Sequence, residues 1–423
     1  MSLIAKVHAR EILNSRGYPT VEVDVTLESG VMGQASVPTG ASIGTYEAYD
    51  LRDGDAGRYR GKGVLKAVDN INKFIDPMLK GMDPLEQVLI DESLIHLDGT
   101  LHKTRLGANA VLAVSLAVAR AAAHSMNMPL WRYLGGLNAN LLPVPFMNVI
   151  SGGTRLNKNL NIQEFLIIPH GAPFFTESLR MGAETYHALE DVLADKGKMT
   201  GVGDEGAFYT DFRDQEEALD SLMKAIKKAG YVPGTDISIG LDIAASHFCS
   251  NGAYQFPSSN YKYTSGELID MYEILCGKYP IMSIEDGLAE DDWHGWKSMT
   301  ERLGAKIQLI GDDLFVTHKE RLRIGIENGA ANSVLVKPNQ IGTLTETMNV
   351  IDMARRNGYQ SIISHRSGET ADNFIADLTV ATGAGQIKAG APCRVDRLAK
   401  YNRLIRIEES LQGRSQFAGN FEA

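Results

Sequence analysis

Charged residues end a series of short apolar segments in the second half of the sequence. In order along the chain, these residues are Asp242, Glu285, Asp312, Lys337, His365 with Arg366, and Lys388. If the apolar segments are neighbouring strands, the three acids crowd together and repel one another unless a cation holds them. Oxygen ligands without a nearby cysteine favour a hard divalent ion, with Mg²⁺ first. The alternative is that each acid caps the helix that follows it, but the repetition favours a metal site.

Lys337 follows the apolar residues 334–336, at a position where an unpaired lysine is rarely buried. Beside a metal ion and the second ammonium of Lys388, we expect the pKa of Lys337 to fall, so that it can act as a general base near neutral pH. One alternative is a lysine that pairs with an acid or reaches solvent. Another is a nucleophile that forms a Schiff base, as in an aldolase.

Two further acids could act on a leaving hydroxyl group. Glu164 follows Gln163 at the start of an apolar segment, and Glu205 lies in the glycine-rich stretch "GVGDEG". A pair of carboxyl groups in unlike environments can serve as an acid and its orienting partner, although each could also belong to a surface turn. The stretch "PTGASIGTYE", residues 38–47, has the small residues of a mobile lid or of an ordinary loop.

The elements that position these residues follow a regular rhythm. From Glu285 onward, the charged segment ends recur about every 25 residues, which is the length of one strand plus one helix. Repeating βα units with almost continuous apolar strands predict a parallel sheet covered by helices, and their number favours an α/β fold closed into a TIM-like (β/α)8 barrel. In such a barrel the carboxyl ends of the strands meet on one face, so the charged residues converge there.

The first third of the chain has a different pattern. Polar residues alternate with Val21, Val23, Val25 and Leu27 up to a turn at residues 28–30, which predicts a hairpin. Helical spacing follows over residues 64–75 and 84–97 and after Gly107. Strands followed by helices indicate a small α+β domain. We therefore expect an N-terminal capping domain over residues 1–138 and a barrel domain over residues 139–423.

Composition limits the classes of function. The 423 residues hold 42 Lys and Arg against 52 Asp and Glu, a net charge of −10, which argues against a nucleic-acid partner. The apolar run from Ala110 is interrupted by Arg120, so we expect a core helix and no membrane span. Three cysteines without metal-ligand spacing suit a reducing compartment. Without the pattern of a signal peptide, we expect a cytoplasmic protein.

Longer motifs resemble those of the enolase family over nearly the whole chain. They include "VHAREILNSRG", "GVGDEG", "SIEDGLAEDDW", "KPNQIGTLTET", "SHRSGET" and "RLAKYNRLIRIEE". The resemblance implies an enolase-type barrel with one antiparallel strand, the second, after a smaller α+β domain. It also implies a glycolytic hydro-lyase that reversibly dehydrates 2-phosphoglycerate to phosphoenolpyruvate. Two Mg²⁺ ions per active site, the second arriving with substrate, and a homodimer or ring of dimers are further implications.

The resemblance also implies a role for individual residues. Lys337 would remove the α-proton, and Glu205, supported by Glu164, would protonate the leaving hydroxyl. The metal ligands would be Asp242, Glu285 and Asp312 for the first ion, with Thr39 for the second. The residues in contact with the substrate would be Gln163, Glu164, His365, Arg366, Ser367, Lys388 and Arg155.

Several positions depart from the family pattern. They are Thr39 for a serine, Ile43 for a threonine, Arg155 for a histidine, Ala207 for a glycine, His247 for a glutamate and Pro338 for a valine. Pro338 restricts Lys337 to an extended backbone, and Arg155 offers a planar fork for phosphate oxygens or is a solvated loop residue. Two alternatives therefore stay open: a dehydratase for a related phospho- or phosphono-hydroxyacid, and a weakened paralogue kept as a binding protein.

Overall fold

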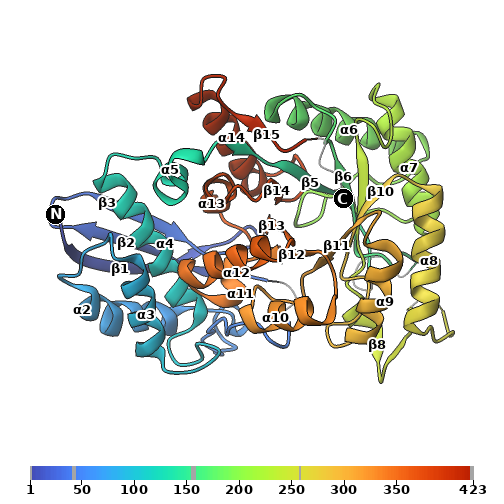
Figure 1. Ribbon diagram of the computed structural model, residues 1–423. Coiled ribbons are helices and arrows are strands. Elements are labelled where there is room, and N and C mark those ends of the chain that lie inside the picture. Colours follow the sequence, from blue (N-terminus) through green and yellow to red (C-terminus); the bar gives the residue numbers. More distant parts are fainter. Residues whose placement is uncertain (1, 41–43, 154–158, 257–258, 420–423) are drawn as a thin grey trace.

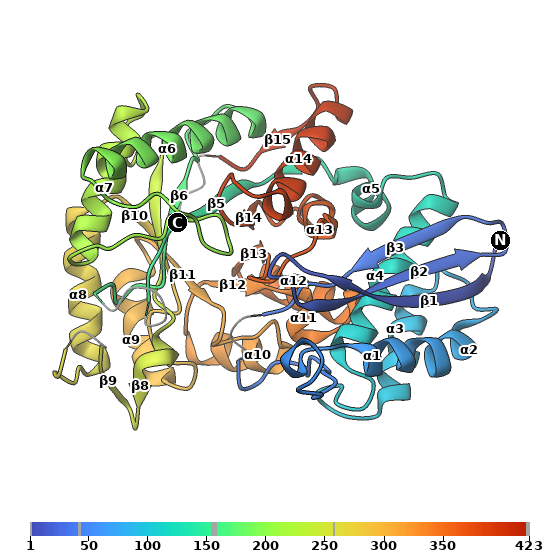
Figure 2. The same cartoon turned by 180° about the vertical axis from the view of Figure 1, so that it is seen from behind.

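The computed structural model describes residues 2–40, 44–153, 159–256 and 259–419. Two positions named above, Ile43 and Arg155, lie outside the described residues. The chain forms an N-terminal α+β part at one end of the molecule and a strand barrel surrounded by helices at the other (Figures 1 and 2).

The N-terminal part begins with an antiparallel sheet in the order β1-β2-β3. Its strands are β1 (Ile4–Leu13), β2 (Pro19–Leu27) and β3 (Met32–Ser36). The predicted hairpin is confirmed as β2 and β3, which pair from Glu22 opposite Ser36 to Thr26 opposite Met32. The strand β1 was not predicted, because a register irregularity between Ile4 and Lys6 disturbs its alternation of buried and exposed residues.

Helices follow the sheet, as the periodicity predicted. They are α1 (Leu65–Asn70), α2 (Asp76–Leu79), α3 (Gln87–Asp98), α4 (Ala108–Ser125) and α5 (Leu130–Gly135), with a π-helical turn at Ile71–Ile75 between α1 and α2. The Ala-rich α4 approaches the sheet closely, because Gly33 on β3 has no Cβ to collide with the backbone of Ala121. Within the described residues, α4 is the one helix long and apolar enough to cross a membrane, but 83% of that stretch is buried in the fold.

The barrel is closed and has eight strands, which confirms the predicted fold class. The strands are β5 (Val144–Ser151), β6 (Glu164–Ile168), β7 (Ser238–Asp242), β10 (Ile281–Glu285), β11 (Gln308–Gly311), β12 (Ser333–Val336), β13 (Gln360–Ser364) and β14 (Gln386–Lys388). The second strand, β6, runs antiparallel to both β5 and β7, and the other neighbours are parallel. The first residue of β6, Glu164, therefore lies at the same end of the barrel as the last residues of the parallel strands.

Helices surround the barrel and alternate with its strands. They are α6 (Phe175–Asp195), α7 (Gln215–Lys228), α8 (Ser265–Lys278), α9 (Trp293–Leu303), α10 (Lys319–Asn328), α11 (Pro338–Ile341), α12 (Leu344–Arg356), α13 (Phe374–Thr382) and α14 (Val395–Ser410). Two small strand pairs complete the fold: β4 (Leu141–Leu142) with β15 (Gln416–Phe417), and β8 (Cys249–Ser250) with β9 (Ala253–Tyr254).

Apolar side chains fill both sides of the barrel wall. One large core extends from the N-terminal sheet through the layer between strands and helices. A second cluster contains Val144, Phe146, Leu166, Ile168, Ile310, Leu335 and Ile362, with Phe417 of the C-terminal strand packed against it. This packing fixes the strand positions, and with them the charged residues at the strand ends.

Backbone and ion-pair contacts dock the N-terminal part on the barrel. Thr39 and Gly368 exchange backbone hydrogen bonds of 2.8 and 2.9 Å, because Gly368 has no Cβ to collide with Thr39. Arg120 of α4 holds the carboxylate of Asp372, just before α13, through bonds of 2.6 and 2.7 Å. Segments far apart in the sequence are thus held together where the N-terminal part meets the barrel.

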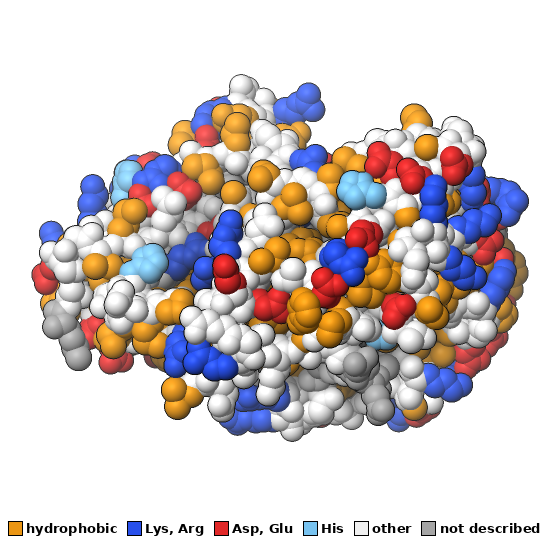
Figure 3. All heavy atoms as spheres, turned by 90° about the horizontal axis from the view of Figure 1, so that it is seen from above, with side chains coloured by type: hydrophobic (Ala, Val, Ile, Leu, Met, Phe, Trp, Pro, Cys, Tyr) orange, Lys and Arg blue, Asp and Glu red, His pale blue; other side chains and the backbone are white. Residues whose placement is uncertain are grey.

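Charges of both signs share the surface. On the face in Figure 3, acidic and basic side chains lie interspersed among apolar ones. Along α6, for example, Arg180 lies between Glu177 at 2.6 Å and Glu184 at 2.9 Å. Exposed pairs of this kind contribute little to stability, which directs attention to the buried charges.

Candidate active site

A cavity of about 610 Å³ opens at the carboxyl ends of the barrel strands. Ten of the thirteen predicted site residues line it: Gln163, Glu164, Glu205, Asp242, Asp312, Lys337, His365, Arg366, Ser367 and Lys388. Glu285 lies behind this lining and contacts Lys388. The structure therefore brings the charged strand ends together, as the barrel geometry predicted.

Lys388 gathers three carboxylates at the base of the cavity. Its Nζ lies 2.9 Å from Glu164, 3.1 Å from Asp242 and 2.7 Å from Glu285. The strand register places these acids side by side, since Asp242 is opposite both Glu164 and Glu285. Their side chains are at most 10% exposed, so they share the cation in a region of low dielectric.

One cation does not balance this cluster. Burial, together with the charges of Asp242 and Asp312, raises the pKa of Glu285 to about 8, although Lys388 and Lys337 oppose the shift. The buried Oε1 of Glu285 has no hydrogen-bond partner among the described residues. A buried carboxylate oxygen without a partner fits a ligand of a hard divalent cation, so the residues present suit the predicted metal.

A second acidic group lies beside the first and shares Asp312 with it. Carboxylate oxygens of Asp286, Asp312 and Asp313 lie within 4.8 Å of one another and could hold a metal ion. The carboxylate of Asp286 also accepts the backbone N–H groups of Asp312 at 2.9 Å and Asp313 at 2.8 Å. This contact fixes the orientation of Asp312, as expected for an outer partner of a metal ligand.

Lys337 forms an ion pair with Asp312 in this structure. Pro338 begins α11, and Lys337 has the extended backbone that Pro338 was expected to impose, with φ −123° and ψ 103°. The predicted fall in its pKa is wrong for this state. Burial is the largest single effect and lowers the pKa of Lys337, but attraction to carboxylates, to Asp312 first and then to Glu285, makes the net shift upward. The prediction assumed a metal beside Lys337, whereas here Asp312 stabilises the ammonium directly.

Glu164 and Glu205 occupy unlike environments, as predicted. Burial and the charge of Glu205 raise the pKa of Glu164 well above its usual value. Burial also disfavours ionised Glu205, but His365, Arg397 and Lys388 outweigh it and lower its pKa to about 2. Asn148 donates to Glu205 at 3.2 Å, and His365 Nε2 lies 3.5 Å from it. The group with the raised pKa is therefore Glu164, whereas the sequence assigned the acid role to Glu205.

Arg366 reaches the cavity from the loop after β13. Its guanidinium forms two bonds with Glu47, at 2.9 and 3.2 Å, and both side chains are 5% exposed. This pair could not be predicted from the sequence, since its members are 319 positions apart. Asn148, Gln340 and Arg397 were likewise not assigned to the site. Arg397 could have been suspected only because it lies within the family-like "RLAKYNRLIRIEE" stretch.

Three residues that depart from the family pattern differ in their place relative to the cavity. The Thr39 hydroxyl accepts a 2.8 Å hydrogen bond from Asn14 and is not part of the cavity lining, so its role as a metal ligand stays a prediction. His247 lies at the cavity wall. The turn with Ala207 needs no glycine there, because the positive φ of 82° belongs to Gly206.

Comparison with known families gives two matches that together span nearly the whole chain. Residues 4–134 match the family model described as the enolase N-terminal domain. Residues 139–423 match the model described as the enolase C-terminal TIM barrel domain.

Proposed function

The chain belongs to the enolase family, and we propose that it reversibly dehydrates 2-phosphoglycerate to phosphoenolpyruvate. The family points to lyase-type chemistry, and one observation carries the proposal further. Two lysines and the buried carboxylates around them meet at a single cavity, with an arginine at its wall. That set can remove a proton next to a carboxylate, hold the resulting negative charge and bind a phosphate.

Lys337 is the proposed base. Its Nζ must be neutral to take the α-proton, so the ion pair with Asp312 has to give way when the site is loaded. Lys388, on β14, keeps its charge and offers an ammonium to the substrate carboxylate. Asp242, Glu285 and Asp312 would hold Mg²⁺, which supplies positive charge for the enolate.

The carboxyl pair of Glu164 and Glu205 is proposed to protonate the leaving hydroxyl. The two groups titrate together, and burial with the charge of Glu205 raises the pKa of Glu164. Glu205, which also accepts from Asn148 at 3.2 Å, is the more exposed of the two and lines the cavity. Proton delivery then requires transfer within the pair before the C–O bond breaks.

Arg366 is the proposed phosphate contact, with His365, Ser367 and Gln163 beside it. A guanidinium matches a phosphate with two parallel hydrogen bonds, which are the bonds that Arg366 now gives to Glu47. We also propose a cytoplasmic location, for which three free cysteines are suitable, and a homodimer. A second Mg²⁺ that arrives with substrate belongs to the same proposal.

The test is a steady-state assay of phosphoenolpyruvate formation with and without a chelator. We expect activity that requires Mg²⁺, loss of at least about 100-fold in Glu285→Gln because the enolate loses its counter-charge, and no change in the exposed control Lys297→Gln. Full activity in the chelated enzyme would refute the metal-dependent mechanism. Inactivation by borohydride with substrate would instead support a Schiff base at Lys337.

A second candidate is action on a related phospho- or phosphono-hydroxyacid, which the departures from the family pattern at Arg155, Thr39 and Ile43 motivate. It would be favoured if the protein exchanges the α-proton of such an acid in a Mg²⁺-dependent manner but does not dehydrate 2-phosphoglycerate. Inactivity with both substrates would favour a paralogue kept as a binding protein.

A further inference from the structure

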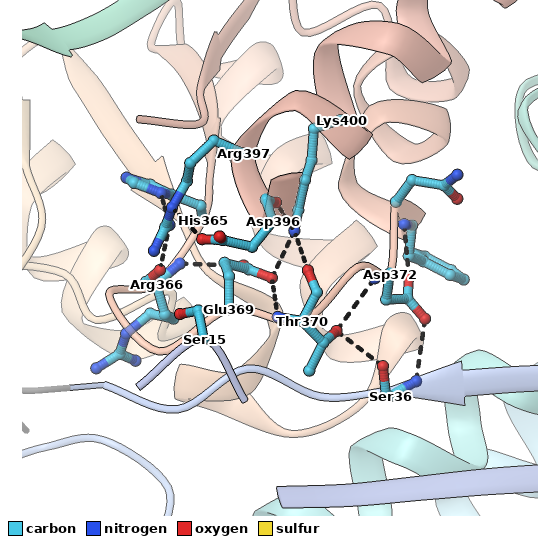
Figure 4. Close-up of polar contacts among 12 residues, drawn as sticks. Ser15, Ser36, His365, Arg366, Glu369, Thr370, Asp372, Asp396, Arg397 and Lys400 are labelled. Carbon is cyan, nitrogen blue, oxygen red and sulfur yellow. Dashed lines mark hydrogen bonds and ion pairs between the residues drawn. The ribbon is translucent and has the colours of Figure 1, made fainter. Parts of the chain in front are cut away.

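Arg397, on α14, is a fully buried arginine. Its side chain lies beside His365 (Figure 4). It is not part of the cavity lining, yet its guanidinium contacts residues that are. Its acceptors are His365 Nδ1, the carbonyls of Arg366 and Ser367 at 2.6 Å each, and the carbonyl of Asp204 at 3.2 Å, and its Nε lies 2.8 Å from Asp396. A fully buried guanidinium is costly unless such contacts compensate it, so its position requires an explanation.

These acceptors belong to two loops that are distant in sequence. One loop follows β13 and carries His365, and the other carries Glu205 after Asp204. Backbone packing shows how closely they meet: a Cβ on Gly390 would lie 2.8 Å from both Arg397 Cδ and the Glu205 carbonyl. Arg397 therefore ties the loop of the proton-donating pair to the loop of the proposed phosphate contact.

The contact with His365 has a chemical consequence. Arginine only donates hydrogen bonds and stays protonated, so the Nδ1 that it contacts must be the acceptor. Burial also lowers the pKa of His365 well below its usual value and keeps the imidazole neutral. A neutral ring with a bare Nδ1 carries its one proton on Nε2, which lies 3.5 Å from Glu205 Oε2.

The loop that holds these groups is stabilised on its other side by a second buried cation. Lys400 Nζ bonds Glu369 at 2.7 Å, and the other oxygen of Glu369 accepts the backbone N–H of Arg366 at 3.2 Å (Figure 4). Lys400 thus supports the loop backbone, whereas only Arg397 contacts the His365 ring among these residues.

We propose that Arg397 is a positioning residue of the reaction: it holds His365 as the Nε2–H tautomer facing Glu205 and fixes the two loops relative to each other. The part that concerns catalysis rests on the proposed dehydratase function. The tautomer of His365 is independent of that function and can be measured alone.

The experiment uses the intact protein and the matched pair Arg397→Lys and Arg403→Lys. Arg403 is on the same helix, outside the cavity lining, and donates hydrogen bonds of 2.8 and 2.6 Å to Asp377. Replacement by lysine therefore removes a two-pronged guanidinium contact there as well, but away from the cavity. We expect Arg397→Lys to lower kcat about 10- to 100-fold with little change in KM, as outer partners of catalytic groups do. Arg403→Lys should keep wild-type kcat.

Nitrogen NMR of histidine-labelled wild-type protein, with His365→Asn to assign the signal, gives the second readout. We expect an unprotonated Nδ1 and a protonated Nε2 in His365. A proton on Nδ1 would overturn the proposal, and so would a folded Arg397→Lys with wild-type kcat. If Arg397→Lys does not fold, the tautomer of His365 in the wild type tests the proposal. If the wild type does not dehydrate 2-phosphoglycerate, the proposed function is wrong, and the NMR result still tests the proposed role of Arg397.

Discussion

The buried ion pair between Arg120 and Asp372 should be a main link between the N-terminal part and the barrel. Asp372 accepts four hydrogen bonds: two from Arg120, one from Ser36 N–H at 3.0 Å and one from Phe374 N–H at 2.8 Å. The side chains of Arg120 and Asp372 are 15% and 9% exposed. The change Asp372→Asn keeps the shape of the side chain, removes its charge and replaces one acceptor oxygen with an N–H₂ donor.

The geometry sets the expected loss. Each oxygen of Asp372 accepts one Arg120 bond and one backbone N–H. Asparagine has one oxygen, and its amide N–H₂ would face two donors, so two bonds are lost. Hydrogen bonds to charged groups contribute about 1.5–3 kcal/mol each, so two lost bonds give a loss of about 3–6 kcal/mol. Breaking a buried ion pair costs about 3–5 kcal/mol, which lies within that range.

Urea unfolding at pH 7 measures this loss for Asp372→Asn. The control is Asp352→Asn, whose partners Arg355 and Arg356 are 74% and 76% exposed, and whose loss should stay below about 1 kcal/mol. The double variant Arg120→Met with Asp372→Asn should lose less than the two single variants together, because no buried charge is left unpaired. Strict additivity, or equal losses at positions 372 and 352, would refute the reasoning.

The same pair predicts a pH dependence. Burial opposes ionised Asp372, but Arg120 and two backbone N–H groups lower the pKa of its carboxyl below the usual value. A folded pKa below the unfolded one gives stabilisation that is complete above about pH 4 and is lost as pH falls through the folded pKa. The stability difference between wild type and Asp372→Asn should therefore shrink below pH 4. A difference that stays constant there would point to packing.

Three further predictions concern the site and the docking contact between Thr39 and Gly368. Lys337→Gln should abolish exchange of the substrate α-proton with solvent, measured by NMR in deuterated water, and exchange at the wild-type rate would exclude Lys337 as the base. Gly368→Ala should destabilise the fold by about 1–3 kcal/mol in urea unfolding, because the new Cβ would lie 2.9 Å from the Thr39 carbonyl. Gly277→Ala controls for the methyl group, because Gly277 has no positive φ and nothing lies within 4 Å of its Cβ. Arg155→Ala should mainly raise KM for 2-phosphoglycerate while Arg155→His moves both constants toward ordinary enolase behaviour, and unchanged constants in both variants would make Arg155 a bystander.

The barrel could be predicted because its signal is local and repeated. Each strand from β10 to β14 is a short apolar run with a charged residue at or just after its end, and each repeat is read without knowledge of the others. The strand β1 was missed for the opposite reason, since its irregular register leaves no clean alternation. The hairpin of β2 and β3 was found where the alternation of Val21, Val23 and Val25 is regular.

The contacts between distant segments could not be predicted in this way. Glu47 meets Arg366, and Arg397 meets the Asp204 carbonyl, only after the N-terminal part docks and the barrel closes. The sequence around one partner does not indicate the other, because a charged residue in a loop is usually solvated. The family-like motifs contain Arg366 and Arg397 but do not show what either one contacts.

The pKa of Lys337 differs from the expected direction because the pairing of charges depends on closure of the barrel. Lys388 ends β14, whose neighbours are β13 and β5, yet its ammonium reaches carboxylates on β6, β7 and β10. With Lys388 committed to that cluster, Asp312 is left to Lys337, and their ion pair raises the pKa that proximity to another cation was expected to lower. The sequence lists the charges at the strand ends, but closure of eight strands decides which of them pair. A cation that competes for Asp312 would lower the pKa of Lys337, because it weakens the largest of the attractions that hold the proton there.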